Sequence, residues 1–258
     1  MESAAEAERL LSQEDAIETR SRLLAAGLAR GHRALDAGCG PGGVSFEMSQ
    51  LVGAEGSVVG LDASPDRVAQ ARGLWERQAP NLRFHRGDVR ESGLPAEAFD
   101  FVWSQFVFEY LPDPAAALRE LVRVTAPGGR IAVADIDGLG LANWPMPTAL
   151  QRSLETLGQA LAATGFDPHI GRKVFSLFKA TGLRNVRVRL SPFYIAAGAA
   201  DARLQRDWQT RFDTISPIGI KALGAQAYGA LVADFLNLLQ EESALKYAVV
   251  LTTEGVKP

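Results

Sequence analysis

One glycine-rich segment, at 34–43, constrains the fold of this chain more than any other part of its sequence. The segment reads Ala-Leu-Asp-Ala-Gly-Cys-Gly-Pro-Gly-Gly and contains the pattern Gly-x-Gly-x-x-Gly at Gly38, Gly40 and Gly43. Glycines at this spacing let the backbone turn tightly and let a ligand approach the main chain. The same pattern also fits a plain turn between a strand and a helix, so its meaning depends on the residues around it.

The flanking sequence predicts strands that alternate with helices. The expected elements, in order, are a helix at 4–29 that stops at Gly31, a strand at 33–37, a helix at 42–51, a strand at 57–62, a helix at 65–78, strands at 82–86 and 99–104, a helix at 114–124, a turn at 127–129 and a strand at 130–134. This alternation indicates a doubly wound α/β sheet in which the glycines lie between the first strand and its helix.

The second half of the chain departs from this pattern. It predicts a helix at 172–181 and strands at 186–190 and 247–253, separated by stretches without strand character. We therefore expect one domain over 1–258. Its core would comprise about 20–137, 168–190 and a last strand at 245–254, with helical insertions at about 138–167 and 191–243.

Composition excludes several classes of partner. The 258 residues carry a formal net charge of −3, whereas a protein that binds nucleic acid usually carries a basic surplus. The chain has no apolar run of the roughly 20 residues that cross a membrane, and its acidic first residues do not resemble a signal peptide. Cys39 is the single cysteine, which fits a reducing compartment. We expect a cytoplasmic protein without nucleic-acid or membrane partners.

Two carboxylates narrow the choice of ligand. Asp62 ends the second strand about 20 residues after the glycines, where an acid accepts hydrogen bonds from ribose hydroxyls, as it does in NAD-binding proteins. Asp36, however, stands two residues before Gly38, where it would repel a pyrophosphate and attract an ammonium group. Pro41 also removes one backbone N–H from the loop. The loop therefore favours a ligand that carries an ammonium group and no phosphate.

Several ordered segments together resemble class I S-adenosylmethionine-dependent methyltransferases of the small-molecule type. They are the glycine segment itself, Val58–Asp62, the Gly-Asp pair within His85–Val89, Phe99–Ser104 running into Glu109–Pro114, and the Pro-Gly-Gly turn within Ala126–Ile131. The resemblance covers about residues 20–135, with weaker similarity at 171–188. It implies a Rossmann-like, doubly wound, seven-stranded mixed sheet with a helical cap.

The resemblance also implies an activity and its alternatives. The expected reaction moves a methyl group from S-adenosylmethionine to a small biosynthetic acceptor by in-line displacement. It releases S-adenosylhomocysteine and uses no metal. One alternative is a protein of the same fold that binds S-adenosylmethionine and catalyses another reaction, such as cyclisation. A NAD-dependent oxidoreductase is disfavoured by Asp36 and Pro41. A nucleic-acid base methyltransferase is disfavoured because Ser104-Gln105-Phe106-Val107 replaces the Asp-Pro-Pro-Tyr type of segment.

The cofactor site follows from the resemblance, residue by residue. We expect Asp36 to bind the methionine ammonium, Asp62 the ribose, and Asp88 the adenine amino group, with Val89 packed beside the ring. The complete expected set is Asp36, Gly38, Gly40, Asp62, Ala63, Asp88, Val89, Ser104 and Gln105.

The acceptor and catalytic residues are less constrained. We expect the two insertions to form an apolar cap that holds the acceptor, although a dimer interface or additional core explains them nearly as well. Candidate acceptor contacts are Phe106, Tyr110, Trp144, Tyr194 and Trp208. No catalytic residue is identified, and the candidates are Tyr110, which replaces a histidine common among relatives, Asp137, which follows the fifth strand with Asp135, and His169. Asp137 fits a turn cap equally well, and for His169 a position that caps or packs near the following helix is favoured over a catalytic role.

Overall fold

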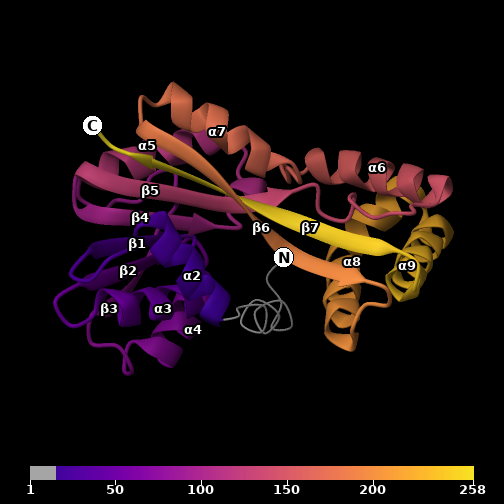
Figure 1. Cartoon of the computed structure of the whole chain (residues 1–258), viewed down its shortest axis with the longest axis horizontal. Helices are drawn as coiled ribbons and strands as arrows, with labels where there is room; N and C mark the ends of the chain where they lie inside the picture. The colour runs from indigo at the N-terminus through magenta and orange to yellow at the C-terminus, as the bar shows by residue number, and fades with distance from the viewer. Residues whose placement is uncertain (1–15) are drawn as a thin grey trace.

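The computed structural model describes residues 16–258 and builds them around one seven-stranded sheet (Figure 1). The strand order is β3-β2-β1-β4-β5-β7-β6, and β7 runs antiparallel to both of its neighbours. The strands are β1 (Arg33–Ala37), β2 (Ser57–Asp62), β3 (Leu82–Arg86), β4 (Phe99–Gln105), β5 (Thr125–Asp137), β6 (Arg184–Ala197) and β7 (Leu245–Val256). The order reverses between β1 and β4, which is where ligands bind in open α/β sheets.

Helices cover both faces of the sheet. They are α2 (Ala16–Ala26), α3 (Gly43–Val52), α4 (Pro65–Trp75), the 3-10 turn η1 (Phe108–Tyr110), α5 (Pro114–Val124) and α7 (Ile170–Ala180). Helices α4 and α5 begin alike: Ser64 and Asp113 cap the first turns, and a proline occupies the first helical position of each. These caps fix where each chain segment leaves the sheet edge.

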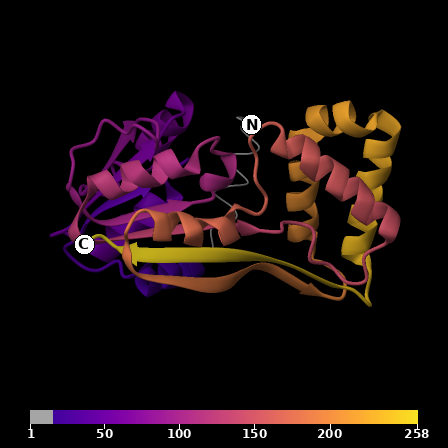
Figure 2. The ribbon, with the colours of Figure 1, turned by 90° about the horizontal axis from the view of Figure 1, so that it is seen from above.

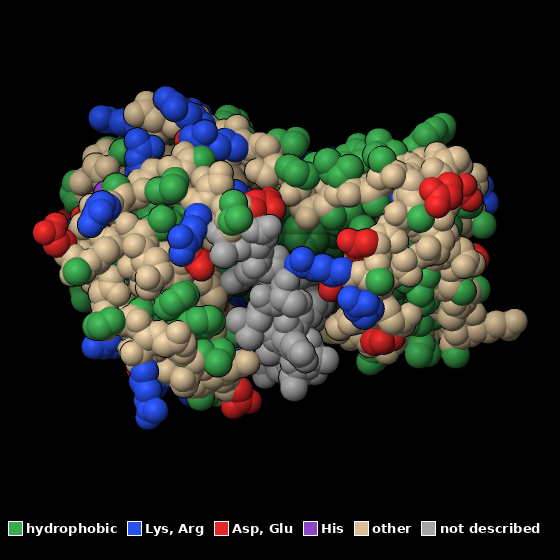
Figure 3. Space-filling view, turned by 60° about the horizontal axis from the view of Figure 1, so that its bottom comes forward, with side chains coloured by type: hydrophobic (Ala, Val, Ile, Leu, Met, Phe, Trp, Pro, Cys, Tyr) green, Lys and Arg blue, Asp and Glu red, His purple; other side chains and the backbone are tan. Residues whose placement is uncertain are grey.

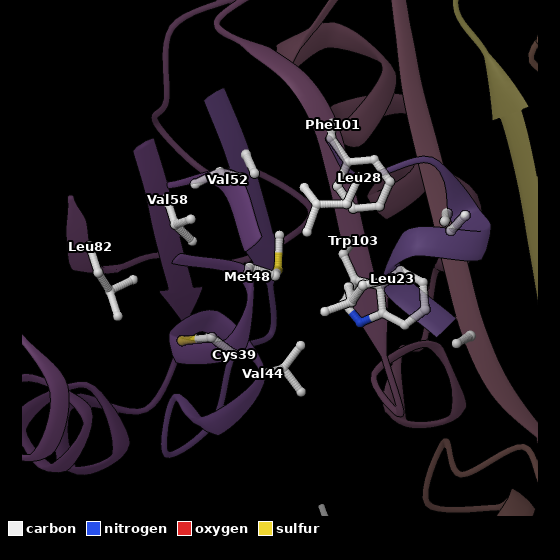
Figure 4. Close-up of a cluster of buried hydrophobic side chains, with 14 of the residues drawn as sticks. Leu23, Leu28, Cys39, Val44, Met48, Val52, Val58, Leu82, Phe101 and Trp103 are labelled. Atoms are coloured by element: carbon white, nitrogen blue, oxygen red, sulfur yellow. The ribbon is translucent and has the colours of Figure 1, made fainter. Parts of the chain in front are cut away.

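The sheet buries apolar side chains on both faces because successive residues of a strand point in opposite directions. Phe101 and Trp103 of β4 belong to one buried cluster with residues of α2, α3 and α4. Figure 4 shows the part of this cluster that α2 and α3 contribute, including Leu23 and Met48. Val102, between them, joins the other cluster with α5 and α7. The near-continuous apolar strands thus follow from a sheet that is covered on both sides.

A separate helical cap stands beyond one end of this core. Strands β6 and β7 continue past the other strands as a paired ribbon, with Tyr194 opposite Ala248 and Ala197 opposite Leu245. The ribbon leads to α6 (Thr148–Ala162), α8 (Ala202–Leu223) and α9 (Ala225–Gln240), which lie together in Figure 2. Their core is built on Trp208, Phe212 and Phe235.

The predicted fold class is confirmed, including the mixed seven-stranded sheet and the helical cap. Several boundaries differ. The helix expected at 4–29 is described from Ala16 and ends at Ala26, because Gly27 adopts a left-handed φ of 102°; its part before Ala16 lies outside the described residues. Helix α4 ends at Trp75 rather than 78. The assignment of 191–197 to a helical insertion is wrong, because these residues extend β6 along β7.

Candidate functional site

A cavity of about 830 Å³ lies between the core and the cap. Its core side is formed by the glycine loop and by the segments that follow β2, β3 and β4. Its other side is formed by the residues after β5, by Phe193 of β6, and by α6 and α8. Figure 3 shows the face on which the core, at the left, meets the cap, at the right, with hydrophobic side chains where they join. A cavity of this size suits a cofactor together with a small molecule.

The glycine loop turns away from β1 at Gly38, which has a left-handed φ of 84°. The backbone N–H groups of Gly38 and Cys39 both donate to the carbonyl of Leu61, at 2.7 and 2.9 Å. A Cβ at Gly38 would lie 2.2 Å from the side chain of Val107, so both the dihedral angle and the close approach require glycine. The loop is thereby fixed to the carboxyl ends of β1 and β2.

Asp36 lies at the base of this loop and lines the cavity although it is 2% exposed. The Ser45 hydroxyl of α3 donates to Asp36 Oδ2. Burial raises the pKa of Asp36 to about 7, against the opposing effect of the Ser45 hydrogen bond and with a further rise from the nearby Asp62. A carboxylate that is costly to ionise in this way is stabilised by a cation beside it.

Asp62 ends β2 and faces the cavity beside the loop. Its Oδ2 accepts the backbone N–H of Gly40 at 2.8 Å, and its Oδ1 accepts that of Ser64 at 2.9 Å. These bonds fix the carboxylate, whose remaining lone pairs are available to hydroxyl donors. Ala63, the next residue and a member of the expected cofactor set, also lines the cavity.

Two further segments complete the core side. Asp88 and Val89 line the cavity, and Asp88 accepts both the backbone N–H of Arg90 at 2.8 Å and its guanidinium. The guanidinium lowers the pKa of Asp88 and keeps it ionised. Gln105, at the end of β4, also faces the cavity, and its buried Oε1 has no hydrogen-bond partner among the described residues. This oxygen is an acceptor that a ligand can satisfy.

The acceptor candidates that line the cavity are Phe106, Tyr110 and Trp208. Phe106 holds an unusual left-handed φ of 55°, and its ring meets the edge of Phe193 at a centroid distance of 5.4 Å. The Tyr110 ring lies 5.3 Å from that of Phe166. The cavity therefore has an aromatic wall from the end of β4 to the cap.

Three cofactor or acceptor candidates do not reach the cavity lining. Ser104 is buried, and its hydroxyl donates to the carbonyl of Ala37 on the neighbouring strand. Trp144 is 77% exposed, outside the lining. Tyr194 lies behind the wall, packed edge-on against Trp208, and burial raises its pKa to about 12. Ser104 and Tyr194 support the site from behind rather than line it.

Two catalytic candidates also lie outside the lining. Asp137 is paired with Arg172 of α7 at 2.6 Å, and its carboxylate lies 3.7 Å from His169 Nδ1. His169 occupies the N-cap position of α7, although its side chain makes no capping hydrogen bond. Asp135 is fully buried and accepts the backbone N–H groups of Ile136 and Glu109. Asp137 thus connects β5 to α7, and Asp135 connects β5 to η1.

The cavity also contains residues that the sequence analysis did not single out. Glu109 of η1 is 5% exposed and lines the core side. Helix α6 presents Leu154, Leu157 and Leu161, and α8 presents an arginine, Arg211, in the same stripe as Trp208. Spacings of three, four and seven residues reveal such stripes in a sequence, but not which cavity they face.

Comparison with known proteins identifies the family. A family model described as a methyltransferase domain matches residues 28–181, which is more than half of the 258 residues. The chain belongs to this methyltransferase domain family, and its fold and cofactor class are those of class I S-adenosylmethionine-dependent methyltransferases. The matched residues include every strand from β1 to β5 and the predicted cofactor segments.

Individual relatives are similar over parts of the chain. Aklanonic acid methyltransferase DauC of Streptomyces sp. (strain C5) is 37% identical over 103 residues, which are 40% of this chain and 47% of the relative. The chain thus spans about half or less of the curated relatives that it matches. Phosphoethanolamine N-methyltransferase 2 of Haemonchus contortus, solved with S-adenosylhomocysteine, superimposes with a TM-score of 0.61 at 17% identity, over 93% of this chain and 52% of that one. The [4+2]-cyclase SpnF gives 0.59 at 19% identity, over 94% and 81%.

The donor set fits the cofactor of this class. Buried Asp36 suits a cation, fixed Asp62 suits hydroxyl donors, and Gln105 Oε1 is an acceptor in need of a donor. Within residues 16–258, no cluster of three His, Cys, Asp or Glu side chains is arranged for a metal ion. Over the same residues, no helix has the length and apolar character to span a bilayer.

Proposed function

We propose that this protein transfers a methyl group from S-adenosylmethionine to a small, largely apolar acceptor held between the sheet and the cap. The observation that carries the proposal is one cavity lined on its core side by Asp36, Asp62, Asp88 and Val89 and on its cap side by apolar residues of α6 and α8. Such a cavity brings a charged cofactor and an apolar acceptor together.

Each core residue has a separate part in this proposal. Asp36 would bind the methionine ammonium, Asp62 the ribose hydroxyls and Asp88 the adenine amino group, while Val89 packs against the ring and Gln105 accepts a hydrogen bond near the end of β4. When bound, S-adenosylmethionine supplies an electrophilic methyl group on a sulfonium sulfur. The glycine loop allows close approach of this group to the backbone.

The cap side would orient the acceptor and exclude water. Phe106, Tyr110 and Trp208 contact the acceptor in this proposal, and the leucines of α6 close the opposite side. Displacement at carbon depends on the alignment of the acceptor atom, the methyl carbon and the sulfur more than on acid–base chemistry. A general base is needed only where the acceptor atom must lose a proton. Of the three catalytic candidates, Tyr110 alone lines the cavity. It therefore replaces Asp137 and His169 as the residue to test.

The test is a transfer assay with S-adenosylmethionine labelled in its methyl group. The full chain is incubated with fractionated small molecules, and labelled products are identified by mass spectrometry. A labelled product heavier than its precursor by one methylene supports methyl transfer. Conversion of an acceptor to an isomer, with the label retained on the cofactor, would instead support cyclisation. Binding of NAD with no binding of S-adenosylhomocysteine would support an oxidoreductase. A cytoplasmic location stays a prediction from the sequence, and a homodimer formed through the insertions stays its open alternative.

A further inference from the structure

The ribbon of β6 and β7 has two different faces where it continues past the end of α7 toward the cap (Figure 1). Along β7, Lys246, Ala248 and Val250 are buried, whereas Leu245 and Tyr247, which alternate with them, are exposed. Successive residues of a strand point to opposite sides of the sheet, so this alternation separates a buried face from a face toward solvent. The buried face carries the packing that joins the ribbon to the core and to the cap.

The face toward solvent consists of large apolar and aromatic side chains. Residues directly opposite each other in an antiparallel pair point to the same side, and Ile195 of β6 lies opposite Tyr247 of β7. Trp144 joins that side from the other edge of β7, because it exchanges two backbone hydrogen bonds with Leu245. The resulting surface, the outer face of the ribbon, comprises Trp144, Leu190, Ile195, Leu245, Tyr247 and Leu251.

Much of the outer face is open to solvent. Trp144 is 77% exposed, Leu190 67% and Ile195 65%. Helix α7 covers the same side of β7 nearer the core, where a Cβ at Gly255 would lie 3.2 Å from Phe178. Together the six side chains expose on the order of 600 Å², since an aromatic side chain alone presents about 150–250 Å². A contiguous apolar patch of this extent marks an interaction surface.

Charged side chains stand at the rim of the outer face. Glu241 and Glu242 are exposed at the cap end, shortly before the chain enters β7. The pair of Asp137 and Arg172 lies at the core end, where Asp137 is opposite Val249. An apolar centre with a polar rim is the usual composition of a protein interface. The two glutamates would repel an anionic lipid surface, so a protein partner is favoured over a membrane.

The area and the arrangement of the outer face fit a second copy of the same chain. A dimer at the lower end of the stable range buries about 600 Å² on each subunit, and in a two-fold dimer the same patch of both subunits meets. The rings of Trp144 and Tyr247 lie toward the cap end, and the aliphatic Leu190 and Leu251 lie toward the core end. Two antiparallel ribbons therefore place the rings of each copy on the aliphatic side chains of the other.

The free edge of β6 is a poorer surface for association than the outer face. Pro192 has no N–H to donate, and the register of β6 against β7 shifts between Pro192 and Tyr194. Both features disfavour the addition of a further strand at an edge. Packing of sheet against sheet, as in a β-sandwich, does not need these backbone groups.

We propose that two copies of this chain form a dimer through the outer faces of their ribbons, packed face to face about a two-fold axis. Trp144 of each copy becomes buried in this interface. The opposite face of each ribbon packs on the cap through Tyr194 and Ala196. A two-stranded ribbon is marginally stable by itself, so the dimer also supports the connection between core and cap that encloses the cavity.

Sedimentation velocity of the full chain tests this proposal, and the wild type should dimerise reversibly between about 1 and 100 µM. Ile195→Lys places two like charges in the interface and should raise the dissociation constant of the dimer by at least about 100-fold. Leu74→Lys is the matched control, because Leu74 is an exposed leucine of α4, which packs beside β2 and β3 at the other edge of the sheet. It should leave the dimer unchanged. Urea unfolding checks that both variants are folded.

Hydroxyl-radical footprinting with mass spectrometry locates the interface in the wild type alone, so it does not depend on whether a variant folds. Oxidation of Trp144 and Tyr247 should be strong in dilute protein and largely lost in concentrated protein. A wild type that stays a single chain at the highest concentration, a dimer that Ile195→Lys leaves intact, or unchanged oxidation of Trp144 on dimerisation overturns the proposal. Binding of the single chain to vesicles of phosphatidylglycerol and phosphatidylcholine would also overturn it and assign the outer face to a membrane.

Discussion

The Ser45 hydroxyl donates a hydrogen bond of 2.6 Å to Asp36 Oδ2 and so joins the first turn of α3 to β1. This bond holds a buried carboxyl group at the base of the glycine loop. Burial nevertheless raises the pKa of Asp36 to about 7, so the group is divided between its neutral and ionised forms near neutral pH. Only the ionised form attracts a cation.

Cofactor affinity should consequently depend on pH. Below the pKa of about 7, Asp36 is increasingly protonated and must lose its proton before a cationic ammonium binds. The dissociation constant of S-adenosylhomocysteine should therefore rise toward a tenfold increase per pH unit below about 7. Calorimetric titrations between about pH 5.5 and pH 8 measure it. The Asp36→Asn variant should bind S-adenosylhomocysteine more weakly than the wild type at pH 8, and its dissociation constant should not change with pH. The control Asp66→Asn, at an exposed position, should resemble the wild type. A flat wild-type profile would contradict this role.

Folding stability should decrease as the pH rises, whereas cofactor affinity should increase. Asp36 and Asp135 both have a pKa raised to about 7 by burial, so the folded protein holds protons that the unfolded chain releases above its ordinary value of 3.8. Their contribution is complete below that value and is lost as the pH rises through about 7. The free energy of unfolding should fall by up to about 1.4 kcal/mol per pH unit for each group. Urea unfolding between about pH 5 and pH 7 tests this, and a rise over that interval would refute it.

Substitution of Gly38 by alanine tests the glycine loop, and the same substitution at Gly73 is its control. Gly38→Ala places a Cβ 2.2 Å from Val107 at a φ of 84°, so it should cost at least about 1–3 kcal/mol of unfolding free energy and abolish cofactor binding. Gly73→Ala, inside α4 with nothing within 4 Å of its Cβ, should leave binding intact and stabilise the protein by about 0.5–1 kcal/mol. Thermal unfolding and calorimetry measure both effects. Normal binding by Gly38→Ala would show that the loop tolerates displacement.

Phe235 tests whether the cap is energetically separate from the cofactor site. It is fully buried, lies 4.4 Å from Trp208 by ring centroids, and does not line the cavity. Phe235→Ala should lower the free energy of unfolding of the cap by about 3–5 kcal/mol. It should also reduce binding of an apolar acceptor far more than binding of S-adenosylhomocysteine. Urea unfolding measures the loss of stability, and calorimetry measures the binding of each ligand. A parallel loss of both ligands would mean that core and cap unfold as one unit.

The core of the fold was predictable because its signals are local. Ser64 and Asp113, each followed by proline, mark helix starts, and apolar runs mark buried strands. The last part of β6, after Pro192, was not predictable from local signals. Residues after Pro192 pair with β7 across a register shift, and this pairing depends on partners about fifty residues away in the chain.

Site residues could be predicted where their position in a sequence motif determines whether they reach the cavity. Asp36 lies in β1, Asp62 ends β2, and Asp88 and Val89 follow β3; all four reach the cavity. Trp144 and His169 carry suitable side chains, yet Trp144 is exposed to solvent and His169 lies at the start of α7, both outside the cavity lining. Arg211 was missed because its stripe on α8 becomes a cavity wall only when α8 packs opposite the core.

The most direct test of the central claim is calorimetric titration of S-adenosylhomocysteine into the wild type, Asp62→Ala and the exposed control Asp66→Ala. Asp62 accepts the Gly40 N–H at 2.8 Å and faces the cavity, so it links the glycine loop to the proposed ribose contact. The account predicts binding by the wild type and the control, and an affinity at least about tenfold weaker for Asp62→Ala, the equivalent of roughly 1.4 kcal/mol. Absence of binding to the folded wild type, or equal affinity in all three proteins, would contradict it.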